Sequence, residues 1–190
     1  LTVNNVTVNE GSPFAVFTVS GAASQQAKLS LTAGTATLTD DFGPTLQYST
    51  DGGANWSSYT AATYVTLNGS GKLLVRTPIV QDEDYEISET FTLVATNTGG
   101  TPASGTATIL DDGSGAIYPD NTTGNPDPSA PRNDDRSVKV DSPLVNEASP
   151  YAVFNISGTP GQPVSLGLSS GAATLGTDTA AAGTLEWFNG

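Results

Sequence analysis

A stretch of fourteen residues recurs in this chain at a constant offset of 137 positions. Residues 8–21 read VNEGSPFAVFTVSG and residues 145–158 read VNEASPYAVFNISG, with ten of the fourteen positions identical. The match continues from residues 29–38 into residues 166–175, where two leucines and an Ala-Thr-Leu triplet recur. A period this long indicates whole domains in tandem rather than a solenoid of short units. Tandem repetition serves reach or multivalency, so it weighs against an enzyme.

The second copy is shorter than the first. With a two-residue insertion, residues 45–48 align with residues 184–187, and nothing in the chain matches residues 56–112 a second time. We therefore expect a complete domain at residues 1–112 and the N-terminal half of a second at residues 138–190, cut from something longer. Residues 113–137 hold four prolines among Asp, Asn and Gly, which predicts a semi-stiff linker; whether it extends freely or lies along the surface of the first domain stays open.

Short runs of alternating apolar residues predict the fold class. They are separated by Gly, Asn, Asp or Pro clusters, and no helical pattern is convincing. Seven or eight short strands in about 110 residues are typical of an all-β, Greek-key β-sandwich of the immunoglobulin type. The expected inward-facing residues are Ala15, Phe17, Val19, Leu29, Leu31, Leu46, Tyr48, Val65, Leu67, Leu73, Val75, Phe91, Leu93, Ala95, Ala107 and Ile109.

Composition excludes several classes of function. The chain has no cysteine, histidine or methionine, which removes disulfides, the usual zinc sites and the commonest general base. A formal net charge of −13 argues against binding to nucleic acid or anionic lipid. No apolar stretch approaches the length of about 20 residues that a membrane-spanning helix needs, so no membrane insertion is expected.

Clusters of carboxylates point to a cation. Five lie within residues 82–89, others follow predicted strands, and residues 77–131 contain no lysine or arginine. Because strand ends and loops of a Greek-key sandwich meet at its poles, these groups would repel one another unless a hard divalent cation such as Ca²⁺ bound them. The alternative is a solvated acidic surface. Glycoside hydrolysis by paired carboxylates is disfavoured, because a thin sandwich offers no obvious cleft and cation-binding carboxylates have low pKa values.

Four segments in order resemble the Calx-β family of calcium-binding β-sandwich modules: residues 8–11, 34–42, 79–91 and 107–112. The resemblance covers residues 1–112 and, as a half, residues 138–188. It implies Ca²⁺ as the bound metal, and it places Glu83, Asp84 and Glu89 in solvent. Gln81 stands where calcium-sensing relatives carry an aspartate, which favours one or two sites of ordinary affinity over a sensor. The implied calcium ligands are Glu10, Asp41, Asp82, Glu86, Asp111 and Asp112.

The linker and the repeats also resemble those of giant bacterial adhesins that are exported by type I secretion (RTX-type). That resemblance implies a secreted protein of the bacterial cell surface, in which calcium-stiffened repeats act as a spacer for adhesion or biofilm formation. The partners it implies are neighbouring modules of the same polypeptide, with a host or surface glycan or protein as ligand of the parent. It also allows the half module to be one that an inserted domain splits.

One motif suggests a second function. Residues 49–56, STDGGANW, match the Asp-box pattern, which predicts a hairpin with Asp51 capping the turn and Trp56 packed beneath. The alternative is that Trp56 and Tyr59 form an aromatic platform that binds a glycan or a protein.

Overall fold

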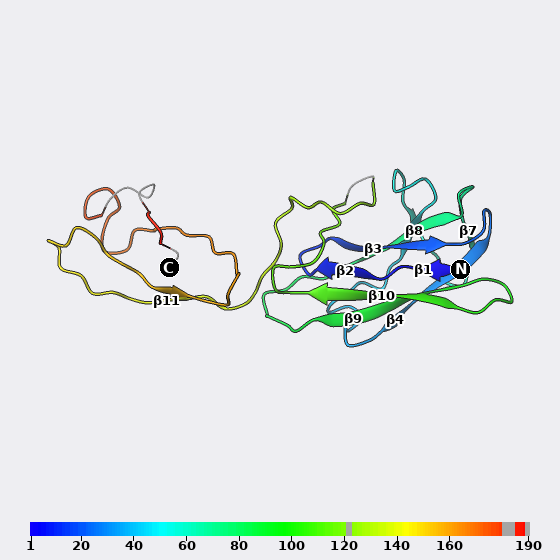
Figure 1. Ribbon diagram of the computed structural model, residues 1–190, viewed down its shortest axis with the longest axis horizontal. Coiled ribbons are helices and arrows are strands. Elements are labelled where there is room, and N and C mark those ends of the chain that lie inside the picture. Colours follow the sequence, from blue (N-terminus) through cyan, green and yellow to red (C-terminus); the bar gives the residue numbers. More distant parts are fainter. Residues whose placement is uncertain (121–122, 180–184, 189–190) are drawn as a thin grey trace.

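The computed structural model describes residues 1–120, 123–179 and 185–188. Residues 1–110 form two five-stranded sheets that pack face to face, so the predicted all-β sandwich is confirmed (Figure 1). The first sheet has the spatial order β1 (Thr2–Val3), β3 (Phe14–Ser20), β8 (Lys72–Pro78), β5 (Gln47–Ser49) and β6 (Ser57–Ser58). The second has the order β2 (Val6–Asn9), β10 (Ala103–Leu110), β9 (Glu89–Thr96), β4 (Gln26–Ala33) and β7 (Val65–Thr66).

Strand pairing is antiparallel throughout both sheets, except that β2 runs parallel to β10. None of the described residues belongs to a helix that is long and apolar enough to cross a membrane.

The core lies between the two sheets, where the predicted alternation places it. Of the sixteen residues expected to face inward, fourteen are buried, and the other two, Leu31 and Tyr48, are partly buried against the same core. The ring of Phe91 in β9 stacks on Phe42 at 4.2 Å and meets Phe17 of β3 edge-on at 6.0 Å. Phe42 thereby fixes the loop that follows β4, which also carries Asp41.

The segment after β10 lies against the sandwich. Ala116 forms a parallel bridge with Val8, so this segment covers the edge of β2 that β10 leaves open. Ile117 is buried, and Tyr118 bridges Phe14 and packs against the core. Gly115 has φ +90, and a Cβ there would stand 2.5 Å from the backbone nitrogen of Asn9, so only glycine permits this close approach.

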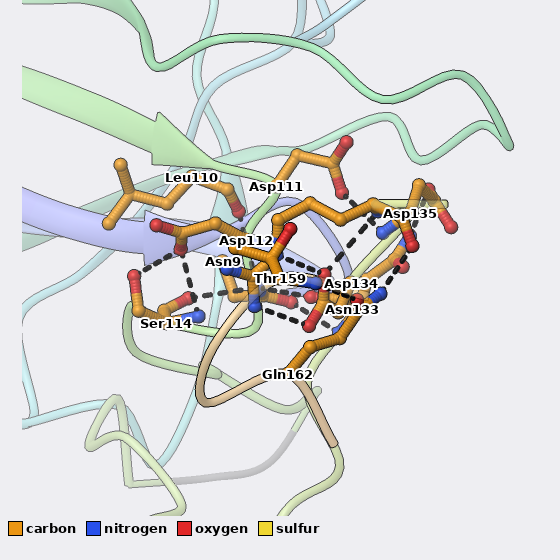
Figure 2. A network of polar contacts seen from close by, with 11 residues as sticks. Asn9, Leu110, Asp111, Asp112, Ser114, Asn133, Asp134, Asp135, Thr159 and Gln162 are labelled. Atoms are coloured by element: carbon orange, nitrogen blue, oxygen red, sulfur yellow. Dashed lines mark hydrogen bonds and ion pairs between the residues drawn. The ribbon is translucent and has the colours of Figure 1, made fainter. Parts of the chain in front are cut away.

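Asn9 attaches the same segment to the pole of the sandwich where β2 and β10 end (Figure 2). Its buried side chain donates to the carbonyl oxygens of Leu110, Ser114 and Asn133 at 3.2, 2.8 and 2.9 Å. Its Oδ1 accepts from the backbone nitrogens of Asn133 at 2.7 Å and Gly11 at 3.0 Å. One side chain therefore joins the end of β2 to chain more than a hundred residues later.

The Asp-box hairpin between β5 and β6 forms as predicted. Asp51 accepts from the backbone nitrogen of Asn55 at 2.9 Å. Gly52 and Gly53 have positive φ angles of 78° and 97°, as the turn requires. Trp56 is half-buried, and its ring lies 4.2 Å from the Arg76 guanidinium.

Within the described parts of the second copy, residues 138–179 and 185–188, the strands form one two-stranded antiparallel sheet, β11 (Lys139–Val140) with β12 (Ile156–Ser157). Its register is that of β1 with β3 shifted by 137 residues. The turn after β4 recurs too: the backbone nitrogen of Thr174 donates to Asp178 as that of Thr37 donates to Asp41.

Candidate metal centre

The alternation of side chains along two neighbouring strands, β2 and β10, brings carboxylates to one pole of the sandwich. Val6 and Val8 of β2 face the core, and two residues further on Glu10 continues that face. In β10, Ala107 and Ile109 face the core, and Asp111 follows in the same phase. Because β2 and β10 are parallel neighbours with Val8 opposite Ile109, their two terminal carboxylates lie side by side.

The first carboxylate group consists of Glu10, Asp111 and Asp135, whose ligand oxygens all lie within 4.8 Å of one another. Both Glu10 and Asp111 are 5% exposed. Asp111 accepts from the backbone nitrogens of Glu86 at 3.0 Å and Asp135 at 3.4 Å, so it joins the loop before β9 to the segment after β10. Glu10 Oε1 accepts from the backbone nitrogen of Asp82 at 3.0 Å. Glu10 Oε2 is buried and has no hydrogen-bond partner among the described residues.

The second carboxylate group consists of Asp41, Glu86 and Glu89, again with ligand oxygens within 4.8 Å of one another. Asp41 lies in the turn before Phe42, where its carboxylate accepts from the backbone nitrogen of Thr37. Glu89 is the first residue of β9 and lies two positions before the buried Phe91, on the same face of the strand. Residues of both groups line one small cavity of about 10 Å³, which has room for about one water-sized ion.

Burial and crowding shift the pKa values of these carboxyls upward. Burial raises the pKa of Glu10 from 4.5 to about 7, and the nearby charges of Asp111 and Asp82 add to the rise. Burial, followed by the hydrogen bond and charge of Asp41, raises the pKa of Glu89 to about 7. The pKa values of Asp111 and Glu86 are raised as well, chiefly by burial. Ionising all of these groups together is therefore costly unless positive charge is supplied.

That charge does not come from the basic side chains that the structure describes. Arg76 pairs with Asp120 at 3.0 Å, and Arg136 pairs with Asp134 at 2.7 Å. No other ion pair forms among the described residues, and neither of these two includes a member of the carboxylate groups. An all-oxygen donor set with a buried, unpaired carboxylate oxygen fits Ca²⁺, which takes six to eight oxygen ligands in irregular geometry.

The six residues named as ligands from the sequence are distributed unevenly. Four lie in the two carboxylate groups, while Asp82 is exposed and meets Glu10 through its backbone nitrogen. Asp112 points the other way, because it follows Asp111 in the opposite phase; its carboxylate accepts from the backbone nitrogen of Ser114 at 3.1 Å (Figure 2). It belongs to neither group among the described residues.

The sequence interpretation missed two members of these groups. Glu89 was expected in solvent, which is wrong: it is half-buried and lines the cavity. Its phase with Phe91 is the signal that could have placed it there. Asp135 could not have been found in this way, because a long segment of irregular chain separates it from β10. Glu83 and Asp84 are exposed, as expected.

The two aromatic residues of the alternative platform are engaged in internal contacts. The Arg76 guanidinium lies between the rings of Trp56 and Phe14, 4.2 and 3.9 Å from their centroids. Tyr59 donates from its hydroxyl to the Thr63 carbonyl at 2.9 Å and accepts from the Leu29 nitrogen at 3.0 Å. Both rings therefore serve the packing of the sandwich.

Fold and site together define a β-sandwich module with a carboxylate-lined pole. Its fold is similar to the apo-form Calx CBD1 domain, with 18% identity and a TM-score of 0.41 over 58% of this chain and 96% of that chain. CBD12 from CALX1.2 is 16% identical with a TM-score of 0.41, over 59% of this chain and 46% of that chain. The CupB2 chaperone of Pseudomonas aeruginosa is 9% identical with a TM-score of 0.36, over 55% and 52%. No family model and no curated protein matches the chain.

Proposed function

We propose that this chain is a calcium-binding structural module in which Ca²⁺ holds tandem repeats in a stiff array. The observation that carries the proposal is the Oε2 atom of Glu10, which is buried, lacks a hydrogen-bond partner among the described residues, and belongs to a group with Asp111 and Asp135. A cation bound by these three residues would satisfy that oxygen and remove the repulsion between the carboxylates.

The spacer role follows from where Asp135 lies in the chain. Glu10 and Asp111 belong to the first sandwich, whereas Asp135 stands at the end of the segment that leads into the second copy. A cation shared by the three would tie the segment that leads into the second repeat to the pole of the first. Without it, their charges repel one another and favour release of that segment, so the angle between repeats would vary more widely.

The biological setting extends this proposal. The tandem repeat and the Pro/Asp-rich connection support a secreted adhesin of the bacterial cell surface, in which neighbouring modules of the same polypeptide are the immediate partners. Adhesion or biofilm formation would then be the role of the parent, with a host or surface glycan or protein as its ligand. We propose no enzymatic activity for the module.

Thermal melting with and without calcium tests the metal site. At a calcium concentration ten times Kd, one site adds about 1.4 kcal/mol, which raises Tm by roughly 5 °C for a module of this size. Asp111→Asn should abolish the rise, while Asp112→Asn, the adjacent residue outside both groups, should keep it. Equal Tm values of the unmodified chain in EDTA and in millimolar Ca²⁺ would refute calcium binding.

Limited proteolysis tests the spacer role separately. The chain has six Lys and Arg residues, so its tryptic map is simple, and two of them, Arg132 and Arg136, flank Asp135. Calcium should slow cleavage after both at least tenfold and leave cleavage after the exposed Lys139 nearly unchanged. If calcium raised Tm but did not slow cleavage at Arg132 and Arg136, the metal would stabilise the sandwich without holding the exit segment, residues 113–136, in place.

A further inference from the structure

Arg136, the last residue of the exit segment, is fixed to the pole of the first copy. Asp134 forms an antiparallel bridge with Asp112, so this stretch of chain is extended and runs along the residues that follow β10. In extended chain, neighbouring side chains point to opposite sides. Asp135 accordingly joins the first carboxylate group, while Nε and Nη2 of Arg136 donate to the two carboxylate oxygens of Asp134, each at 2.7 Å. This ion pair is largely buried, with the side chains of Arg136 and Asp134 16% and 5% exposed.

The carbonyl oxygen of Arg136 is bound by a side chain of the second copy. It accepts a hydrogen bond from Nε2 of Gln162. Figure 2 draws Gln162 in one network with Asp134 and Asp135. Gln162 ends the turn that follows β12, and β12 pairs with β11, which begins three residues after Arg136. One side chain therefore joins the hairpin of the second copy to the exit segment.

The turn that presents Gln162 also occurs in the complete first copy. Oε1 of Gln25 accepts from the backbone nitrogen of Ala22 at 2.9 Å, and Oε1 of Gln162 accepts from that of Thr159 at 3.1 Å. The backbone nitrogen of each glutamine donates to the carbonyl oxygen of the same residue, at 3.1 and 3.0 Å. The residue before each glutamine has a positive φ, 60° in the first copy and 84° in the second. The conformation of this turn is therefore a local property of the module, and because Oε1 serves the turn, Nε2 is the group that reaches outside it.

We propose that Gln162 couples the second repeat to the exit segment, with the turn at residues 158–162 as the docking element of the joint. The inference rests on the proposed spacer function, in which a cation at Asp135 holds that segment on the first repeat. Three residues, 136–138, separate Asp135 from β11, and Gln162 binds the first of them. The second repeat then has two residues about which to rotate, whereas loss of the hydrogen bond would leave it three.

Tryptic cleavage tests the joint directly, because the carbonyl that Gln162 binds belongs to the peptide bond that trypsin cuts after Arg136. Gln162→Glu is the sharpest variant of the full chain: its carboxylate still accepts from the Thr159 nitrogen but cannot donate to Arg136. The matched control is Gln25→Glu, which alters the same turn in the first copy. In calcium, Gln162→Glu should be cut after Arg136 about fivefold faster than the unmodified chain, the factor expected for the loss of one hydrogen bond. Cleavage after Arg132 should stay within about twofold, because that residue depends on the attachment of the exit segment to the first repeat.

Cleavage after Lys139 separates the joint from the stability of the hairpin, because Lys139 lies in β11. If Gln162→Glu sped cleavage after Lys139 by the same factor as cleavage after Arg136, the variant would have unfolded the hairpin, and the proposal would be overturned. An equal gain at Arg136 in Gln25→Glu would overturn it too, because the effect would not be specific to the joint.

Two further outcomes distinguish this inference from the function on which it rests. If calcium protected Arg132 in every variant, but Gln162→Glu and the unmodified chain were cut equally fast after Arg136, the spacer function would stand and the role of Gln162 would be refuted. If calcium protected neither Arg132 nor Arg136 in the unmodified chain, both proposals would fail.

Discussion

Replacing Glu10 by Gln should stabilise the metal-free protein at neutral pH. In the unmodified chain the backbone nitrogen of Asp82 donates to Glu10 Oε1 at 3.0 Å. Glutamine keeps the shape of the side chain and an oxygen that can accept this hydrogen bond, but it removes the buried charge. The pKa of Glu10 rises from 4.5 to about 7 on folding, chiefly because the carboxyl is buried. At about 1.36 kcal/mol for each pKa unit, keeping this group ionised in the folded state costs about 3 kcal/mol.

The sign of the pH dependence follows from that difference. Below pH 4.5 the carboxyl is protonated in both states, and it makes no difference to stability. Between pH 4.5 and about 7 the unfolded chain has released the proton while the folded protein retains it, so the free energy of unfolding falls as pH rises through this window. Glu89 has the same raised pKa and adds to the fall.

Urea denaturation in EDTA measures the effect. At pH 7.5 Glu10→Gln should have a free energy of unfolding about 3 kcal/mol above that of the unmodified chain, and at pH 5 the difference should shrink to about 1 kcal/mol. Calcium at ten times Kd should narrow this difference by about 1.4 kcal/mol, because the variant lacks a charged ligand, and at about 1,000 times Kd, where binding adds about 4 kcal/mol to the unmodified chain, the order should reverse. If the variant were less stable than the unmodified chain at pH 7.5 in EDTA, the reasoning about an unpaired buried carboxylate would be refuted.

Two further substitutions test how Asn9 attaches the segment after β10 and how Arg76 packs between two aromatic rings of the sandwich. Asn9→Ala removes five hydrogen bonds and should lower the free energy of unfolding, measured in urea, by about 2–3 kcal/mol. Asn146→Ala, at the equivalent but exposed position of the second copy, should lower it by almost nothing. Equal effects of the two substitutions would contradict the role of Asn9 in attaching the segment after β10. Arg76→Lys keeps the charge but not the planar group between Phe14 and Trp56, so it should lower stability by about 1–3 kcal/mol; an unchanged Tm would contradict this.

The alternation of apolar residues was enough to predict the sandwich and its core. A period of two specifies which face of each strand is buried, and the turn chemistry around Gly52 and Gly53 specifies one of the hairpins. The same rule, carried past the strand ends, separates Asp111 from Asp112 and places Glu89 at the cavity. The six ligands taken from the family resemblance did not make that distinction, since a motif gives residue order but not side-chain direction.

The course of residues 113–136 could not be predicted in detail. A composition of Pro, Gly, Asp and Asn is typical both of a free linker and of irregular chain that packs on a surface. What decides between them is long-range: the fit of Ile117 into the core and the hydrogen bonds of Asn9 to Asn133, 124 residues away in sequence. For the same reason Asp135 was not placed beside Glu10 and Asp111.

A crystal structure of the chain grown with calcium, with anomalous data, would show whether the first carboxylate group binds an ion. We expect an ion at roughly 2.3–2.6 Å from carboxylate oxygens of Glu10, Asp111 and Asp135, the distances usual for Ca²⁺. An anomalous peak bound to Asp112 or to the exposed loop alone, or no peak in the presence of saturating calcium, would contradict it.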